Sequence, residues 1–358
     1  MIELVIRTGG LLSPAPGGPR IGLSAEAVKL FRDGDGRVRR SRRLADPPLT
    51  PAFDTVREVM GETARALGAA GNAAVQSVVA EVRELPGAAW RRTRVLARVE
   101  TVAGPVLAGA ETRGTPAGEG PRAALRDLGA RLSGLPSRLA DPPAGWEGLP
   151  LVLAPDVAAV VVGGTWLVLT SRGGHRARER LAGRKVLPGI TLSDLPSAHP
   201  PGFPDDAGRP AGEIRLVDGG VLRPREPEEA TGALPGRAVW DHDRGALVPA
   251  QVCRVRVGGA DAPPTERFTE LVWCVEGVQR YRPDGEVWLT CLARVSTRPS
   301  GWFAVRLRGR PQRLLKISGG FLGEAVPVCT DSDVTTRALL LPSARELEEE
   351  GNGTVGTL

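Results

Sequence analysis

The chain has 358 residues, of which 41% are hydrophobic and 25% are charged, and its formal net charge is +6. This composition is typical of a globular protein of two ordinary domains and excludes a disordered or fibrous chain. No apolar stretch approaches the roughly 18 to 20 residues that cross a bilayer, and residues 1–10 lack a signal-peptide core. We therefore expect a soluble, cytoplasmic protein without a membrane partner.

The positive charge carries little functional information. Nearly all of the basic residues are arginine, and 46 glycines and 32 prolines accompany them, which together indicate a high-GC coding bias. The densest basic run, residues 37–43, follows the turn signal Asp33-Gly34-Asp35-Gly36 between two strand-like segments. It lacks interleaved aromatic residues for base stacking, so we interpret it as a solvated hairpin arm and expect no nucleic-acid partner.

The first half of the chain predicts, in order, strands and turns, an amphipathic helix, three Val-rich antiparallel strands and a second helix. These elements span residues 1–46, Thr50 to Gly68 or Gly71, 78–85, 92–100, 106–111 and 121–132. Pro- and Gly-rich residues 136–145 follow, and we place a domain boundary after them, close to residue 147. We expect an N-terminal α/β-type domain over residues 1–146, with antiparallel strands and two helices.

The second half is rich in strands and predicts a barrel-like or sandwich-like domain over residues 147–358, so the fold class is α+β. Its strands are expected at residues 152–162, 213–217, 238–242, 252–257, 286–295 and 302–308. Residues Pro188 to Pro210 read as a long loop, which in a compact domain is usually functional or mobile. Ser343–Glu350 predicts a short acidic helix, and residues 351–358 are expected to fray.

Few residues are available for catalysis by soft metal ligands or imidazole. The chain has three histidines and four cysteines, namely His175, His199, His242, Cys253, Cys274, Cys291 and Cys329. The cysteines lack CxxC spacing and read as reduced thiols, mostly in strands. No GxSxG, HExxH or HExxxH motif occurs, and the pairs Gly163-Gly164 and Gly219-Gly220 lack the GxGxxG spacing and the strand–helix context of a pyrophosphate cradle. The sequence therefore predicts neither a nucleophile elbow nor a helical zinc-peptidase site.

Two acidic clusters are candidates for substrate contact or for an interface. Asp241-His242-Asp243 has the composition of a metal or acid–base cluster, but Arg244-Gly245 follows it, which favours a surface turn. Asp205-Asp206 precedes Gly208 and reads first as a turn in the same way. We keep Asp194, Asp205, Asp206, Asp241 and His242 as candidates for substrate contact or an interface, and we assign no metal ligand in this chain.

Three segments in order resemble the TldD/PmbA family of U62-type metallopeptidases. They are LVLAPDVAAVVV (151–162), PGITLSDLP (188–196, with Asp194) and FPDDAGRP (203–210), the last followed by IRLVDGGVL (214–222). The resemblance covers roughly residues 78–225. In catalytic members the first segment leads directly into HExxxH, and the resemblance places those three positions at Gly163, Gly164 and Val168. All three chemical groups are therefore missing here, and a hairpin at Gly163-Gly164 is an alternative local structure.

This departure resembles the non-catalytic TldE/PmbA-type subunit, which forms a heterodimer with a zinc-bearing TldD-type partner. The resemblance implies a chain that encloses a proteolytic chamber and positions a peptide or a small amide of a biosynthetic pathway, with zinc only on the partner. Cys329 is the sole candidate by position for the family's C-terminal cysteine. The 188–210 loop is then either a chamber wall or an ordinary surface excursion.

Two other functions remain open at this point. The chain is alternatively a homo-oligomeric binding or scaffold protein that has left peptidase chemistry. It is otherwise a remodelled enzyme that uses Asp205, Asp206, Asp241 or His242 in a new site. Zinc content and the presence of a partner distinguish these functions from a non-catalytic subunit.

Overall fold

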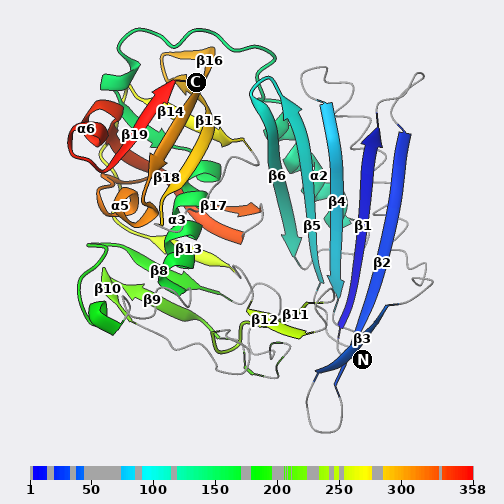
Figure 1. Ribbon diagram of the computed structural model, residues 1–358. Helices are drawn as coiled ribbons and strands as arrows, with labels where there is room; N and C mark the ends of the chain where they lie inside the picture. Colours follow the sequence, from blue (N-terminus) through cyan, green and yellow to red (C-terminus); the bar gives the residue numbers. More distant parts are fainter. Residues whose placement is uncertain are drawn as a thin grey trace. The chain divides into compact units, whose positions relative to one another are not determined.

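The chain divides into two compact units (Figure 1). The first comprises Met1–Ser137 with Asp206–Gly208 and Trp240–Leu247, and the second comprises Arg138–Asp205, Arg209–Val239 and Val248–Leu358. The main division falls somewhat before the boundary expected at residue 147. The structure is a computed structural model, and it describes residues 3–13, 20–32, 38–43, 74–84, 91–113, 119–170, 179–195, 205, 207, 209–210, 212–223, 234–241, 246–249, 254–275, 285–329 and 333–357.

The first unit contains a six-stranded antiparallel sheet with the order β3-β2-β1-β4-β5-β6. Its strands are β1 (Glu3–Ser13), β2 (Arg20–Arg32), β3 (Val38–Arg43), β4 (Ala74–Glu84), β5 (Arg91–Thr101) and β6 (Gly104–Arg113). The pairing of β2 with β3 confirms the hairpin expected around the basic run. The three Val-rich strands are confirmed as β4, β5 and β6. The helix expected after Thr50 lies outside the described residues.

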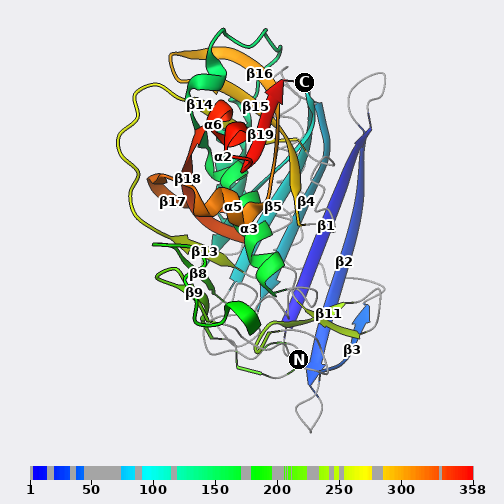
Figure 2. The ribbon, with the colours of Figure 1, turned by 60° about the vertical axis from the view of Figure 1, so that its left-hand side comes forward.

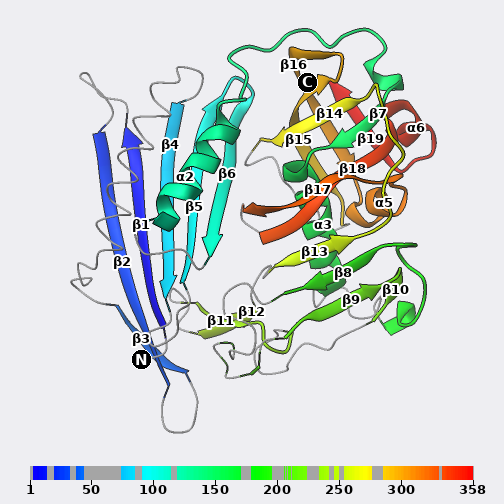
Figure 3. The same ribbon diagram turned by 180° about the vertical axis from the view of Figure 1, so that it is seen from behind.

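Helix α2 (Glu119–Leu132) packs against β5 and β6, as the view from behind shows (Figure 3). Burial alternates along β5, where Val95, Ala97 and Val99 are fully buried between half-exposed neighbours. This alternation is what a sheet with one covered face requires. Helix α2 supplies the cover, because Ala124 and Leu128 are one turn apart and both buried. The predicted second helix is thus confirmed.

The second unit is built on an eleven-stranded mixed sheet with the order β10-β9-β8-β13-β18-β7-β14-β15-β16-β19, in which β17 also pairs with β18 (Figures 2 and 3). Most neighbours are antiparallel, but β13 with β18 and β7 with β14 are parallel. The strands are β7 (Pro150–Leu153), β8 (Thr191–Asp194), β9 (Ile214–Asp218), β10 (Val221–Leu222), β13 (Val255–Gly258), β14 (Thr269–Cys274), β15 (Val287–Val295), β16 (Arg298–Gly309), β17 (Gly320–Cys329), β18 (Asp333–Ser343) and β19 (Gly353–Thr357). A separate pair, β11 (Ala238–Asp241) and β12 (Ala246–Pro249), forms a two-stranded sheet. The α+β class expected from the sequence is confirmed.

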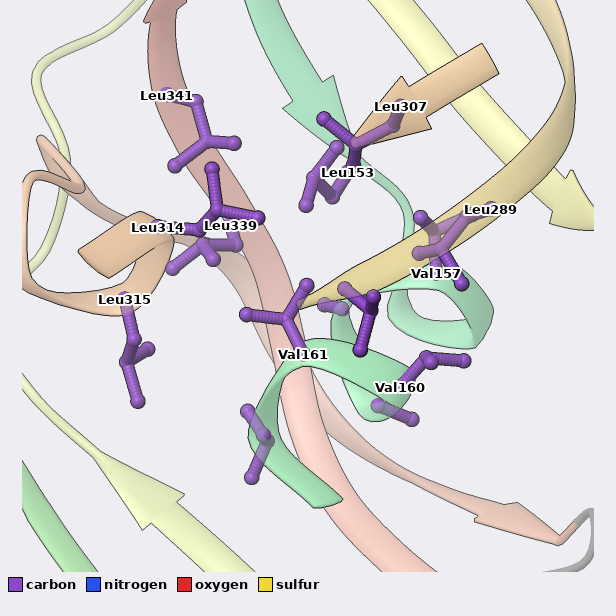
Figure 4. Close-up of a cluster of buried hydrophobic side chains, with 14 of the residues drawn as sticks. Leu153, Val157, Val160, Val161, Leu289, Leu307, Leu314, Leu315, Leu339 and Leu341 are labelled. Atoms are coloured by element: carbon purple, nitrogen blue, oxygen red, sulfur yellow. The ribbon is translucent and has the colours of Figure 1, made fainter. Parts of the chain in front are cut away.

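Helix α3 (Pro155–Thr170) lies at the centre of the second unit's core (Figure 4). Every residue from Val157 to Trp166 is buried, so the helix has no polar face. Side chains from the strands of the eleven-stranded sheet join the same core cluster. Helix α5 (Pro311–Lys316) contacts α3 directly. The remaining short helices are η1 (Trp146–Gly148) and α6 (Ala344–Glu349). The β-rich unit is therefore a sheet organised around one apolar helix.

Three expectations for the second half are wrong. Residues 152–162 do not form one strand, because β7 ends at Leu153 and α3 begins at Pro155. Proline suits the first turn of a helix, where its missing N–H is not needed. Gly163 and Gly164 lie inside α3, which excludes the hairpin. Residues 353–357 form β19 on β16 rather than a frayed tail.

Other expectations hold with small shifts. Strands predicted in the second half correspond to β9, β11, β13, β15 and β16. The predicted acidic helix is α6, which Ser343 caps by accepting a hydrogen bond from the Glu346 amide. The stretch from Pro188 to Pro210 is not all loop, since it contains β8, which pairs with β9 and β13. Residues 196–204 of that stretch lie outside the described residues.

Candidate functional site

The residues that the resemblance aligns with the HExxxH motif lie in the second half of helix α3. Gly163 and Gly164 are buried, and Val168 is partly buried. The segment is helical although it is rich in Val and Gly, because an all-apolar helix gains its stability from burial rather than from propensity. Thr165 satisfies its hydroxyl within the helix, with Oγ1 donating to the Val161 carbonyl oxygen at 2.8 Å. The local backbone therefore has the helical form that the motif requires.

The side chains at these positions do not fit a zinc ion. Zinc in catalytic sites takes nitrogen, sulfur or carboxylate ligands from three side chains, and two glycines and a valine offer none. Within the part of the chain that the structure describes, no three His, Cys, Asp or Glu residues gather as a metal site. All three histidines lie outside the described residues. The three aligned positions therefore offer no ligand to a zinc ion.

Asp194 and Arg237 form a buried network at the end of β8. The Arg237 Nε donates to Asp194 Oδ2 at 2.5 Å, and its Nη2 donates to the carbonyl oxygens of Asp194 and Gly212 at 2.9 and 2.7 Å. The other carboxylate oxygen of Asp194 accepts from the Arg254 amide at 2.6 Å. Both charged side chains are at most 4% exposed. Burial of this pair is tolerated because each charge meets several partners.

Asp205 is held by the residue next to Arg237. Its Oδ2 accepts from the Ala238 amide at 2.9 Å, and its Oδ1 accepts from the Arg209 amide at 2.8 Å. The Asp205 amide donates in return to the Arg209 carbonyl oxygen, which closes the turn expected from the sequence. The two candidate carboxylates, Asp194 and Asp205, are thus bound by two consecutive residues, Arg237 and Ala238. Both are buried and engaged with backbone or Arg237.

The other candidate residues are less defined. Asp241 ends strand β11, whereas Asp206 and His242 lie outside the described residues. Sequence reasoning missed Arg237, which organises the segments around Asp194. No local pattern distinguishes this arginine from the many others in the chain. Its only signal is distant, because its carboxylate partner is 43 residues away.

A cavity of about 450 Å³ borders the C-terminal end of α3. Val168 and Leu169 line it from α3. Leu181 and residues 184–187 line it from one further side, and Arg310 with residues of α5 up to Lys316 line it from another. The aligned position Val168 is therefore at the wall of a pocket, although Gly163 and Gly164 are not among its lining residues. This volume lies within the range of roughly 300–1,000 Å³ that is typical of ligand pockets.

Two cysteines face each other across the β14–β15 pair. Cys274 and Cys291 are register partners, and their sulfur atoms are 4.0 Å apart. The hydrogen bond with Cys291 and burial of the thiol raise the pKa of Cys274 well above its usual value, with further contributions from the charges of Cys291 and Asp156. Both are free thiols, as is the buried Cys329. A raised pKa opposes a nucleophilic role for Cys274.

No helix among the described residues is long and apolar enough to cross a membrane. Comparison of the sequence with known protein families finds no match, and comparison with curated proteins finds none either. Among solved structures, TldE from Thermococcus kodakarensis superposes with a TM-score of 0.60, covering 96% of this chain and 95% of that one at 13% identity. The resemblance to TldE/PmbA-type proteins is thereby confirmed in three dimensions: this chain has the fold of TldE.

Proposed function

We propose that this chain is the non-catalytic subunit of a heterodimeric, TldD/TldE-like zinc metallopeptidase or amide hydrolase. Its role is to enclose the substrate chamber and to position a peptide or small amide. A TldD-type partner carrying HExxxH supplies the zinc, which polarises the scissile carbonyl and activates water. We place the assembly in the cytoplasm, without nucleic acid or membrane as a partner.

The observation that carries this proposal is the composition of helix α3. The fold around the helix is that of TldE over nearly the whole chain. At the three aligned positions the side chains are two hydrogen atoms and an isopropyl group, which neither bind a cation nor transfer a proton. A retained framework with an inert motif is what a partner subunit needs, because the chemistry then belongs to the other chain.

The candidate carboxylates support the same conclusion. Asp194 and Asp205 are 2% exposed, and their oxygens accept hydrogen bonds from Arg237, Arg254, Arg209 and Ala238. A general acid or base needs a proton path to substrate, which such engaged and buried groups lack. They are better suited to fixing loops that shape a chamber. Their burial and hydrogen bonding disfavour a remodelled enzyme built on these two residues.

Co-purification tests the proposal. The chain is expressed alone and together with a TldD-type protein from the same genome, and zinc is measured in each chain and in the complex. We expect a stable heterodimer, zinc only where the HExxxH chain is present, and amidase activity only in the complex. The matched control is a partner whose two motif histidines are alanine, which should still assemble but lose zinc and activity.

Two outcomes would contradict the proposal. Stoichiometric zinc in the isolated chain would make it a metalloprotein in its own right. A homodimer that ignores every HExxxH partner offered would instead support the alternative function, a homo-oligomeric binding or scaffold protein. Mass measurement by light scattering distinguishes that homodimer from the expected heterodimer.

A further inference from the structure

The cavity at the C-terminal end of α3 combines an apolar floor with a basic rim. Its apolar side chains come from α3 and from residues 181–187, and include Val168, Leu169 and Leu181. Five cationic side chains surround them, namely Arg184, Lys185, Arg310, Arg313 and Lys316. No acidic side chain is among its described lining residues. The site is therefore apolar in its depth and positive at its edge.

One wall of the cavity is fixed to the edge of the sheet. The amides of Val186 and Leu187 both donate to the Gly220 carbonyl oxygen, at 2.8 and 3.1 Å. Leu222 and Arg184 are joined by a further backbone bond of 3.0 Å between the Leu222 amide and the Arg184 carbonyl oxygen. Because these bonds use only the backbone, the Arg184 and Lys185 side chains are left exposed. The wall is thus preformed, while its two cations remain in contact with water.

The opposite wall is helix α5. Leu314 and Leu315 are fully buried and anchor this helix in the core beside α3 (Figure 4). Arg313 and Lys316 are three positions apart, so they share the helix face opposite that anchor. Both are exposed and line the cavity. Burial of the two leucines therefore determines that these cations face the pocket.

Three of the five cations line this cavity but not a second one that shares part of its rim. Arg310 and Arg313 also line a second cavity of about 260 Å³, which contains Glu286 and Glu348. Arg184, Lys185 and Lys316 do not line that second cavity. Among the described residues, none of these three forms an ion pair. Their charges are available to a ligand, and they set the sign of the field at the cavity mouth.

We propose that this cavity binds an organic anion that carries a carboxylate on an apolar body. The apolar floor takes the body, and the rim of Arg184, Lys185 and Lys316 takes the carboxylate. The last residues of an apolar peptide and a free fatty acid both present this chemistry. The proposal concerns the isolated chain and does not depend on a zinc-bearing partner.

Val168 is both an aligned motif position and a lining residue of this cavity. The resemblance places the second histidine of the zinc motif at this residue, which here lines the floor of the cavity.

Titration calorimetry on the full chain tests the proposal with four probes. These are acetyl-Leu-Leu with a free carboxylate, the same peptide with a C-terminal amide, octanoate, and inorganic phosphate. We expect the free acid to bind at least about tenfold more tightly than the amide, and its affinity to fall as salt rises. Preference for the peptide acid or for octanoate identifies the source of the carboxylate, and either supports the proposal.

Variants locate the binding. Lys185→Gln and Lys316→Gln are each expected to weaken the free acid about two- to fivefold, and the double variant more, with no change for the amide. Arg306→Gln is the matched control, because Arg306 is exposed on β16 and lines neither cavity. Circular dichroism confirms that each variant is folded. Equal binding of acid and amide, phosphate binding as tight as the acid, an equal loss in Arg306→Gln, or no binding at millimolar concentration would each overturn the proposal.

Discussion

The carboxylate of Asp194 and the guanidinium of Arg237 form an ion pair inside the second unit, with Oδ2 and Nε 2.5 Å apart. The pair joins the end of strand β8 to the segment that leads into β11. The arginine also donates to the backbone carbonyls of Asp194, Gly212 and Gly236. One side chain therefore holds together three stretches of chain that are distant in sequence.

Arg237→Met tests this pair. We expect the free energy of unfolding to fall by about 3–5 kcal/mol, because the substitution leaves the Asp194 carboxylate buried without its counter-charge. Adding Asp194→Asn should recover part of that loss. Urea denaturation measures both. Arg215→Met is the control, since Arg215 forms an exposed pair with Glu213 and should lose less than about 1 kcal/mol. Equal losses in the two arginine variants would contradict the assignment.

Gly219 and Gly220 form a matched pair for testing the wall of the cavity. Both have positive φ, +55° and +94°, but only at Gly220 would a Cβ meet backbone, 2.7 Å from the Leu187 carbonyl oxygen. We expect Gly219→Ala to cost about 1–2 kcal/mol for its left-handed conformation, and Gly220→Ala clearly more. Thermal unfolding provides the comparison. If Gly220→Ala were as stable as Gly219→Ala, the backbone at Leu187 would have to move away from the new methyl group without loss of stability, which contradicts this prediction.

The reactivity of Cys274 tests the β14–β15 thiol pair. Because the Cys291 hydrogen bond and burial raise the pKa of Cys274, its thiolate forms only at a higher pH than that of an ordinary cysteine. We expect slow alkylation by iodoacetamide at pH 8, and faster alkylation of Cys274 in Cys291→Ala, which removes the first cause. Peptide mass spectrometry follows each site, with urea-unfolded protein as the reference. Rapid labelling of Cys274 in the native chain would be inconsistent with this environment.

The capping box of α6 predicts a pH-dependent contribution to stability. Hydrogen bonds from the amide and hydroxyl of Ser343 lower the pKa of Glu346 from its usual 4.5. A lowered folded-state pKa gives stability that is present above pH 4.5 and is lost as the pH falls through the lowered value. We expect Glu346→Gln to be less stable than wild type at pH 7 and equal to it in strong acid. The effect is small because the carboxylate is exposed.

Ser343→Ala tests the hydroxyl of the capping box. It removes the oxygen that accepts from the Glu346 amide together with the hydrogen bond that the hydroxyl donates to the Glu346 carboxylate, and we expect a loss of about 1 kcal/mol at neutral pH. Guanidinium denaturation at pH 7 measures it. Ser133→Ala is the control. Ser133 is exposed and lies just after the end of α2, and its hydroxyl donates to the Ala130 carbonyl oxygen in the last turn of that helix. A loss no greater than that of the control would mean that α6 is held by Leu347 alone.

The sequence predicts the sheet of the first unit well, but not helix α3. Strand β5 alternates buried and half-exposed residues because α2 covers one face of the sheet. The sequence largely shows the same alternation as apolar and polar residues with a period of two. Helix α3 shows no such contrast, because tertiary packing surrounds it on all sides. A continuous apolar run is equally compatible with a buried strand and a buried helix. Only Pro155 marks the point where one becomes the other.

The site is predictable only where a local motif carries it. The loss of ligands at Gly163, Gly164 and Val168 follows from the sequence alone, since it concerns residue types. The Asp194–Arg237 pair and the basic rim do not, because they join residues from separate segments. Strand β19 was missed for a related reason, since its pairing comes from β16 and its own sequence contributes one buried valine, Val355.

Strand β7 has a consequence for the order in which the second unit is made. Its Leu153 pairs with Leu339 of β18 on one side and with Leu271 of β14 on the other. This central strand therefore pairs with strands that are synthesised long after it, and pairing between residues so distant in sequence slows folding. Until β18 leaves the ribosome, the apolar helix α3 has no complete cover. We expect nascent chains that end before β18 to need chaperone protection, whereas the sheet of the first unit is free to form earlier.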